Sequence, residues 1–244
     1  MVKFNESSFS YDYSFPAVTL AYFLRYPNPY STHVLSTDVI SRSTDAAGRL
    51  HTLRVHRKSS RLPSAVLKLL PQSVLGNVSG GRSESYILET SIIDVKEGWM
   101  RTESKNLDWT GILSVVEKQE YRRQVPVDEG EDFSVGAGTT GVVTTVMFRS
   151  RLGDRLRARA TRKGEVGVGE EGDEPKKGFL ASWSTSGIQR SIEAIASRKT
   201  ENGLAKSKEG MNVVLERLRN GGLVAVLDGM RKDKERMSFG KEGA

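Results

Sequence analysis

The sequence predicts an α+β protein: a curled antiparallel sheet of about seven strands, a short helix after strand one, and a long C-terminal helix enclosing a tunnel. Between residues 2 and 148, segments of alternating apolar and polar residues indicate strands. Short turn sequences such as residues 45–48 separate these segments, as in an antiparallel meander. After residue 186, apolar residues recur at helical spacing instead.

Composition limits the function classes. The 244 residues include no cysteine, which excludes disulfides and thiolate metal sites, and the formal net charge of +7 favours anionic partners. No apolar run is long enough to span a bilayer, and we expect no secretory leader. The histidines lack metal-ligand spacing and no acid–base or nucleophile pattern is visible, so we expect neither a cofactor, nor a metal, nor an enzyme.

The elements follow in chain order. Residues 2–13 read as an edge strand, Ser14 as a helix N-cap, and Pro27 and Pro29 end the apolar helix that reaches Arg25. The next strand covers residues 32–43, and residues 50–58 pair back on it as a hairpin. The remaining predicted strands are residues 82–95, 98–109, 112–124 and 133–148.

Two segments leave alternatives open. Residues 61–76 are apolar and bracketed by prolines, which fits either a buried connecting helix or a mobile lid that touches a membrane. Residues 149–163 alternate arginine with small apolar residues, which fits either a solvated edge strand or a contact with anionic lipid or nucleic acid. We predict that residues 149–178 form a disordered insertion, because the stretch from 164 onward has low complexity.

The long helix, residues 187–220, is expected to end at Gly221 and Gly222, followed by a short apolar helix over 223–230 and a charged, frayed tail. The long helix has an unusual apolar stripe. The stripe passes through Lys199, Gly203, Lys206 and Gly210 before it becomes apolar again. A buried ammonium is costly, so each lysine must either extend to solvent or meet an anion. The glycines weaken the helix, which fits a ligand or another backbone segment passing close by.

The predicted fold brings cations from several elements toward one place. Arg25 lies at a helix end, His33 and Lys58 near strand ends, and Lys199 and Lys206 on the long helix. An apolar tunnel with a few convergent cations is typical of a site for a lipid with an anionic head group.

Three motifs give the chain a family resemblance. They are Arg-Tyr-Pro-Asn-Pro-Tyr-Ser-Thr-His from Arg25, Asn-Leu-Asp-Trp-Thr-Gly from Asn106, and Lys-Ser-Lys-Glu-Gly-Met from Lys206. Together they resemble the PRELI family, which includes the fungal Ups proteins, over about residues 1–148 and 179–220. The spelling of the first motif is most similar to the phosphatidic-acid branch.

The resemblance implies a START-like lipid-transfer protein, peripheral on the inner membrane in the mitochondrial intermembrane space. It would carry phosphatidic acid from the outer to the inner membrane for cardiolipin synthesis, with a small twin-CX9C helical protein as partner and anionic membrane surfaces as docking sites. Phosphatidylserine transfer and nucleic-acid binding are the alternatives, and no nucleic-acid partner is expected. Residues 1–220 would form the lipid-binding domain, and residues 221–244 a short helix and a charged tail.

The resemblance also assigns residues. The head group would be read by Arg25, His33, Lys58, Lys199, Lys206 and Asn202, although the family has an asparagine where this chain has Gly203. The lid loop would comprise Leu62, Pro63, Val66, Leu67, Lys68, Leu69, Leu70 and Pro71.

Overall fold

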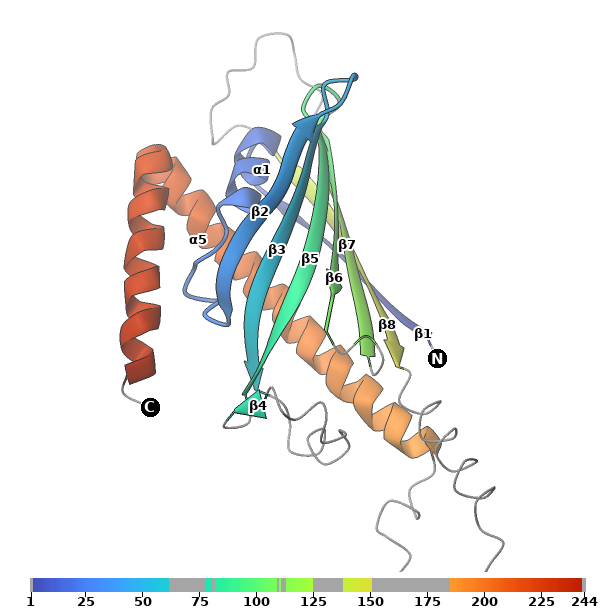
Figure 1. Ribbon diagram of the computed structural model, residues 1–244. Coiled ribbons are helices and arrows are strands. Elements are labelled where there is room, and N and C mark those ends of the chain that lie inside the picture. Colours follow the sequence, from blue (N-terminus) through green and yellow to red (C-terminus); the bar gives the residue numbers. More distant parts are fainter. Residues whose placement is uncertain are drawn as a thin grey trace, which may run out of the picture.

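Across the described residues, the molecule consists of a curved antiparallel sheet and two helices (Figure 1). The structure is a computed structural model that describes residues 2–61, 78–79, 82–108, 110, 113–124, 138–150 and 185–242. The strands are β1 (Val2–Tyr11), β2 (Val34–Thr44), β3 (Leu50–Arg61), β4 (Val78–Ser79), β5 (Arg82–Asp94), β6 (Trp99–Asn106), β7 (Leu113–Arg123) and β8 (Thr140–Ser150). The helices are α1 (Phe15–Phe23) and α5 (Thr185–Glu242). The predicted fold class is confirmed, including the short helix after strand one and the long C-terminal helix.

The strand order explains how the sheet curls. Neighbouring strands run β1-β8-β7-β6-β5-β3-β2, all antiparallel, and the two-residue β4 pairs with β5 beside this path. The first strand therefore pairs with the last, and α1 carries the chain from one edge of the sheet to the other. Both α1 and the first part of α5 lie on the same side of the sheet (Figure 1).

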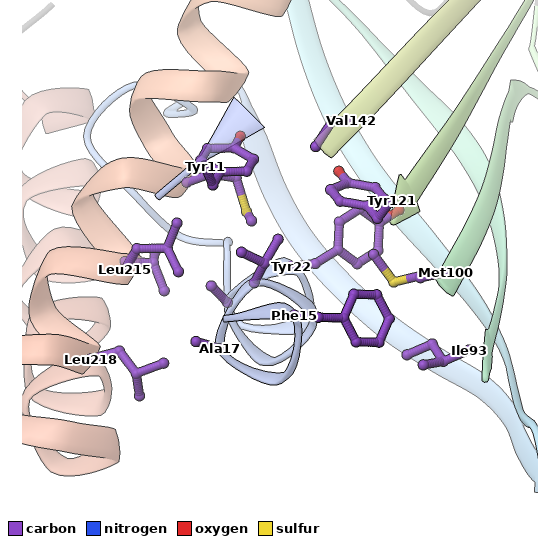
Figure 2. Close-up of a cluster of buried hydrophobic side chains, with 14 of the residues drawn as sticks. Tyr11, Phe15, Ala17, Tyr22, Ile93, Met100, Tyr121, Val142, Leu215 and Leu218 are labelled. Carbon is purple, nitrogen blue, oxygen red and sulfur yellow. The ribbon is translucent and has the colours of Figure 1, made fainter. Parts of the chain in front are cut away.

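The hydrophobic core lies where α1 packs between the sheet and α5 (Figure 2). Alternation along the strands supplies the sheet's share, because every second side chain points inward. Tyr22 of α1 is fully buried and meets Tyr121 of β7 edge to face, with ring centroids 5.6 Å apart. The core consists of Tyr11, Phe15, Ala17, Val18, Ala21, Tyr22, Ile93, Met100, Tyr121, Val142, Met211, Val214, Leu215, Leu218 and Val226.

The inward face of the sheet is not apolar throughout. Beyond the core, the same alternation buries polar and charged side chains in place of apolar ones. These include Thr52, Arg54, His56, Glu89, Ser91, Thr102, Gln119 and Thr144. The interior therefore has an apolar half under α1 and a polar half, and the polar half contains the candidate site.

Helix α5 consists of two helical segments joined at a glycine pair. Gly221 and Gly222 leave helical geometry, and Gly222 has φ of +61°, a conformation that favours glycine. The second segment folds back beside the first, where Arg217 donates to the buried Asp233 at 2.8 Å. The predicted break at 221–222 is thus confirmed. The predicted short helix with a frayed tail was wrong, because the helix continues to Glu242.

Candidate functional site

A buried ionic cluster lies at the boundary between the two halves of the interior. At its centre is Glu89 of β5, whose side chain is 1% exposed. Its Oε2 accepts from Arg25 Nη2 at 2.5 Å and lies 3.1 Å from His56 Nε2. Its Oε1 accepts from Arg54 Nε at 2.9 Å and from Arg54 Nη2. One carboxylate therefore binds two guanidiniums and an imidazole.

Strand register and a helix end bring these groups together. Arg54 of β3 is directly opposite Glu89 of β5, and His56 lies two residues further along the same face. Phe23 is the last residue of α1, and its carbonyl oxygen accepts a hydrogen bond from Arg54 Nη1 at 3.2 Å. Arg25 follows two residues later, so this contact lies next to the second guanidinium.

The side chain of Asn28 holds the turn after Arg25 through two hydrogen bonds to the backbone. Asn28 Nδ2 donates to the carbonyl oxygen of Arg25 at 2.5 Å, and Asn28 Oδ1 accepts from the backbone N–H of Tyr30 at 2.8 Å. A Cβ at Gly210 of α5 would lie 2.8 Å from the Asn28 amide nitrogen. The group that passes close to Gly210 is therefore the Asn28 side chain, and not the ligand or backbone that was expected. At Gly203 a Cβ would meet no atom of the described residues within 4 Å.

The cluster carries one uncompensated positive charge. Burial alone would raise the pKa of Glu89, but Arg25, the His56 hydrogen bond and Arg54 together hold it well below its usual range, so Glu89 is ionised. Burial lowers the pKa of His56, which favours the neutral imidazole at pH 7. Two guanidinium charges thus face one carboxylate charge in a region removed from water.

Arg25 has hydrogen-bonding capacity to spare. Its Nε is buried and has no hydrogen-bond partner among the described residues, while its Cζ lies 3.8 Å from the Tyr22 ring centroid. Burial alone would lower the pKa of Arg25, but Tyr22, Tyr26 and Glu89 together raise it, so the guanidinium stays charged. A buried donor without an acceptor is costly, which makes an anion beside Arg25 favourable.

A cavity of about 320 Å³ opens beside the cluster. Its walls come from the α1–β2 turn, from β3, β5, β6, β7 and β8, and from α5. Among the described lining residues, four cationic and two anionic side chains face it, so this part of the wall is net positive. The lining residues of these two kinds are Arg25, Lys58, Lys105, Lys206, Glu89 and Glu117.

Glu117 of β7 is the second acid of the cavity wall. It is half-buried on the inward face, and burial raises its pKa while the charges of Lys58 and Arg25 act to lower it. The ionised carboxylate is thus less favourable here than in water. Glu117 can accept a hydrogen bond when charged and donate one when protonated.

Four of the six predicted head-group residues line this cavity, three near the sheet and one on helix α5. Arg25 is buried, Lys58 is half-buried, and His33 and Lys206 are exposed at its wall. Asn202 is exposed and does not line the cavity. The backbone of Lys199 lies in α5, but its side chain is outside the described residues. The structure therefore brings together Arg25, His33, Lys58 and Lys206, and leaves Asn202 apart.

The predicted apolar tunnel differs from the cavity observed. Polar and charged side chains outnumber apolar ones among its described lining residues. Sequence reasoning also missed Arg54, His56 and Glu89 as parts of the site. The available signal was the alternation of Arg54, His56 and Lys58 with Leu53 and Val55 along one strand.

Several predictions fall outside the described residues. All the predicted lid residues, 62–71, lie there, as does most of the arginine-rich segment 149–163 and of the insertion 149–178. The lid and the disordered insertion therefore stay predictions. Within the described residues, no group of three or more potential ligand side chains could hold a metal ion. Across the same part of the chain, none of the helices combines the length and apolarity that crossing a bilayer demands.

Sequence comparison finds a family match over about half of the chain. The model of the PRELI-like family matches residues 16–132, which include Arg25, Arg54, Lys58, Glu89 and Glu117. Over that segment the chain is similar to the PRELI-like family. The match contains most of the cavity's charged wall, whereas α5 and β8 lie beyond it.

Named relatives agree with this assignment. The mitochondrial protein UPS1 of Saccharomyces cerevisiae is 40% identical over 122 residues, which cover 50% of this chain and 65% of that protein. The ups1 homolog of Schizosaccharomyces pombe is 43% identical over 108 residues, 44% of this chain and 57% of the homolog. The mitochondrial PRELI domain-containing protein 1 of Gallus gallus is 36% identical over 105 residues, 43% of this chain and 46% of that protein. The chain thus spans less than two thirds of these relatives.

Solved structures with a similar chain path are distant in sequence. The Zhui aromatase/cyclase from Streptomyces sp. R1128 has a TM-score of 0.43 and 12% identity, over 91% of this chain and 98% of that one. Ara h 8.0201 has a TM-score of 0.35 and 14% identity, over 68% of this chain and 91% of that one. Neither likeness bears on function.

Proposed function

We propose that this protein transfers an anionic phospholipid, phosphatidic acid, between membranes. The observation that carries the proposal is the net positive, partly buried wall of the 320 Å³ cavity, where Arg25 Nε lacks a partner within the described part of the chain. A phosphate monoester can accept several hydrogen bonds and carry up to two negative charges, so it suits guanidinium and ammonium groups held together. Arg25, His33, Lys58 and Lys206 are the proposed head-group contacts, with Lys199 and Asn202 as further candidates.

The cavity volume favours a small head group. It lies at the low end of the range for small-molecule sites, about 300–1,000 Å³. A phosphate with its glycerol is a better match for this volume than a bulkier head group. Each acyl methylene left in water costs about 0.8 kcal/mol, so a carrier must also cover the chains during transfer.

The cellular setting is part of the proposal. Two of the relatives above are named mitochondrial, which supports a mitochondrial location. We place the protein in the intermembrane space, peripheral on the inner membrane, carrying phosphatidic acid from the outer to the inner membrane for cardiolipin synthesis. The net charge of +7 would aid docking on anionic membranes, and a small twin-CX9C helical protein is the proposed partner.

The hydrogen bonding of two carboxyl groups in the cavity wall favours a transfer role over catalysis. Glu89 is fully engaged by Arg25, Arg54 and His56, and so is a poor general base. Glu117 is the other carboxyl group among the described residues of this cavity wall, and none of these residues donates a hydrogen bond that would orient it for proton transfer.

Phosphatidylserine is the second candidate because of Glu117. A cavity that holds cations and a carboxylate could bind a head group with both a phosphate and an ammonium. If Glu117 binds the ammonium, Glu117→Gln lowers phosphatidylserine transfer and leaves phosphatidic acid transfer unchanged. A variant that affects neither lipid removes the support for this candidate.

Transfer of fluorescent phosphatidic acid between vesicles tests the proposal. Lys58→Glu reverses a charge at the cavity wall. The control Lys118→Glu makes the same change on the outer face of β7. There Lys118 is half exposed and pairs with Glu103 at 3.4 Å. We expect Lys58→Glu to abolish transfer and Lys118→Glu to retain it. Equal transfer by both variants, or tight RNA binding without any transfer, would refute the proposal.

A further inference from the structure

Glu89 occupies an unexpected position for an acid in a site built to attract anions. It lines the cavity together with Arg25, and its Oε2 is already bonded to Arg25 Nη2 at 2.5 Å. An incoming phosphate that approaches Arg25 therefore meets a guanidinium that is partly occupied. It also meets the negative charge of Glu89, which opposes its entry.

The two oxygens of Glu89 have different partners. Oε1 bonds Arg54, which is also anchored to the carbonyl oxygen of Phe23 at 3.2 Å. Oε2 bonds Arg25 and His56. Arg25 faces the cavity, so its bond to Oε2 is the one a ligand could exchange. Arg54 does not line the cavity and would stay bonded to Oε1 after the exchange.

We propose that Glu89 is a built-in counter-anion of the lipid site, which holds Arg25 at the cavity wall when the site is empty and competes with the lipid phosphate for it. The inference rests on the proposed function and adds a positioning residue to it. Without Glu89, Arg25 would face the ligand and Arg54 would lie behind it with no compensating charge, and a phosphate would be held strongly. Glu89 lowers that attraction, so that the phosphate can leave at the acceptor membrane.

The variant Glu89→Gln separates this role from a structural one. Glutamine keeps the shape of the side chain but removes the charge, so the empty protein loses stability through two uncompensated guanidiniums. An anion restores the balance. We therefore expect dihexanoyl phosphatidic acid to raise the melting temperature of Glu89→Gln by more than that of the wild type. The same variant binds this lipid about tenfold more tightly, or better, and releases it more slowly.

A matched control removes the effect of overall charge. Glu103→Gln makes the same change on β6, where Glu103 faces outward and pairs with the exposed Lys118 at 3.4 Å. This variant should bind the lipid as the wild type does. If Glu89 only positions Arg25, Glu89→Gln binds the lipid no more tightly than the wild type, and the inference fails while the proposed function stands. If the wild type binds no phosphatidic acid, both fail.

A second pair keeps the test open should Glu89→Gln not fold. Arg54→Met removes one guanidinium, and Arg54→Met/Glu89→Gln then also removes the carboxylate, which gives the double variant the wild-type net charge. Competition for Arg25 predicts that the double variant binds dihexanoyl phosphatidic acid at least about tenfold more tightly than Arg54→Met alone. Equal or weaker binding by the double variant would overturn the inference.

Discussion

The substitution Arg54→Met tests the claim that the buried cluster is an interdependent ionic unit. Arg54 is 2% exposed, donates to Glu89 through Nε and Nη2, and donates to the carbonyl oxygen of Phe23. Methionine fills much of the volume but supplies none of these bonds. Breaking a buried ion pair from one side costs about 3–5 kcal/mol, since the remaining charge is left poorly compensated.

The same strand offers a control. Arg57 of β3 points outward, is 44% exposed, and its Nη1 lies 3.8 Å from a carboxylate oxygen of Glu84, which is itself 55% exposed. Such a surface pair contributes about 0–1 kcal/mol, so Arg57→Met should change little. The free energy of unfolding from urea titration, monitored by tryptophan fluorescence, measures both variants. For a chain of this size the Arg54→Met loss corresponds to a fall in Tm of roughly 6–20 °C.

One result would refute this reasoning. If Arg54→Met lies within about 1 kcal/mol of Arg57→Met in its free energy of unfolding, then the cluster is not a buried, interdependent unit. The net positive charge assigned to the site would then lose its basis.

Three further predictions concern pH and glycine. Because burial lowers the pKa of His56, its contribution to stability is complete above pH ~6.5 and is lost as pH falls. In His56→Gln the urea midpoint should therefore depend less on pH between pH 6.5 and 5 than in the wild type. The same pH dependence in both proteins would contradict this. Burial raises the pKa of Glu117, so the wild type loses stability as the pH rises through this raised pKa. The free energy of unfolding of Glu117→Gln relative to the wild type should therefore increase from pH 4.5 to 8 rather than stay constant. Gly203→Ala should stabilise α5 by about 0.5–1 kcal/mol, whereas Gly210→Ala, which meets the Asn28 side chain, should destabilise by about 1–3 kcal/mol; equal urea midpoints would count against the packing described.

The sequence was most informative where local rules decide the structure. The alternation in β2 and β3, the prolines after Arg25 and the glycine pair at 221–222 predicted a strand pair, a helix stop and a helix break. Each of these depends on residues close together in the chain. The same local information predicted that the C-terminal helix ends too early. The second segment of α5 is held by contacts with the first, such as that of Arg217 with Asp233, which local sequence does not reveal.

The ionic cluster could not be predicted in the same way. Arg54 and Glu89 meet because β3 pairs with β5 in one register, 35 residues apart in sequence. Arg25 was expected at the site, but its counter-anion was not, since nothing near Arg25 in the chain indicates a partner 64 residues away. Register between non-local strands depends on the whole sheet.

The amount of lipid phosphorus bound to the reisolated protein tests the central claim most directly. The full chain is incubated with vesicles that contain phosphatidic acid, separated from them, and analysed for phosphorus per mole of protein. We predict about one phosphomonoester lipid per chain for the wild type and for Lys118→Glu, and almost none for Lys58→Glu. No bound phosphorus on the wild type, or an equal amount on Lys58→Glu, would contradict a cationic lipid site in this cavity.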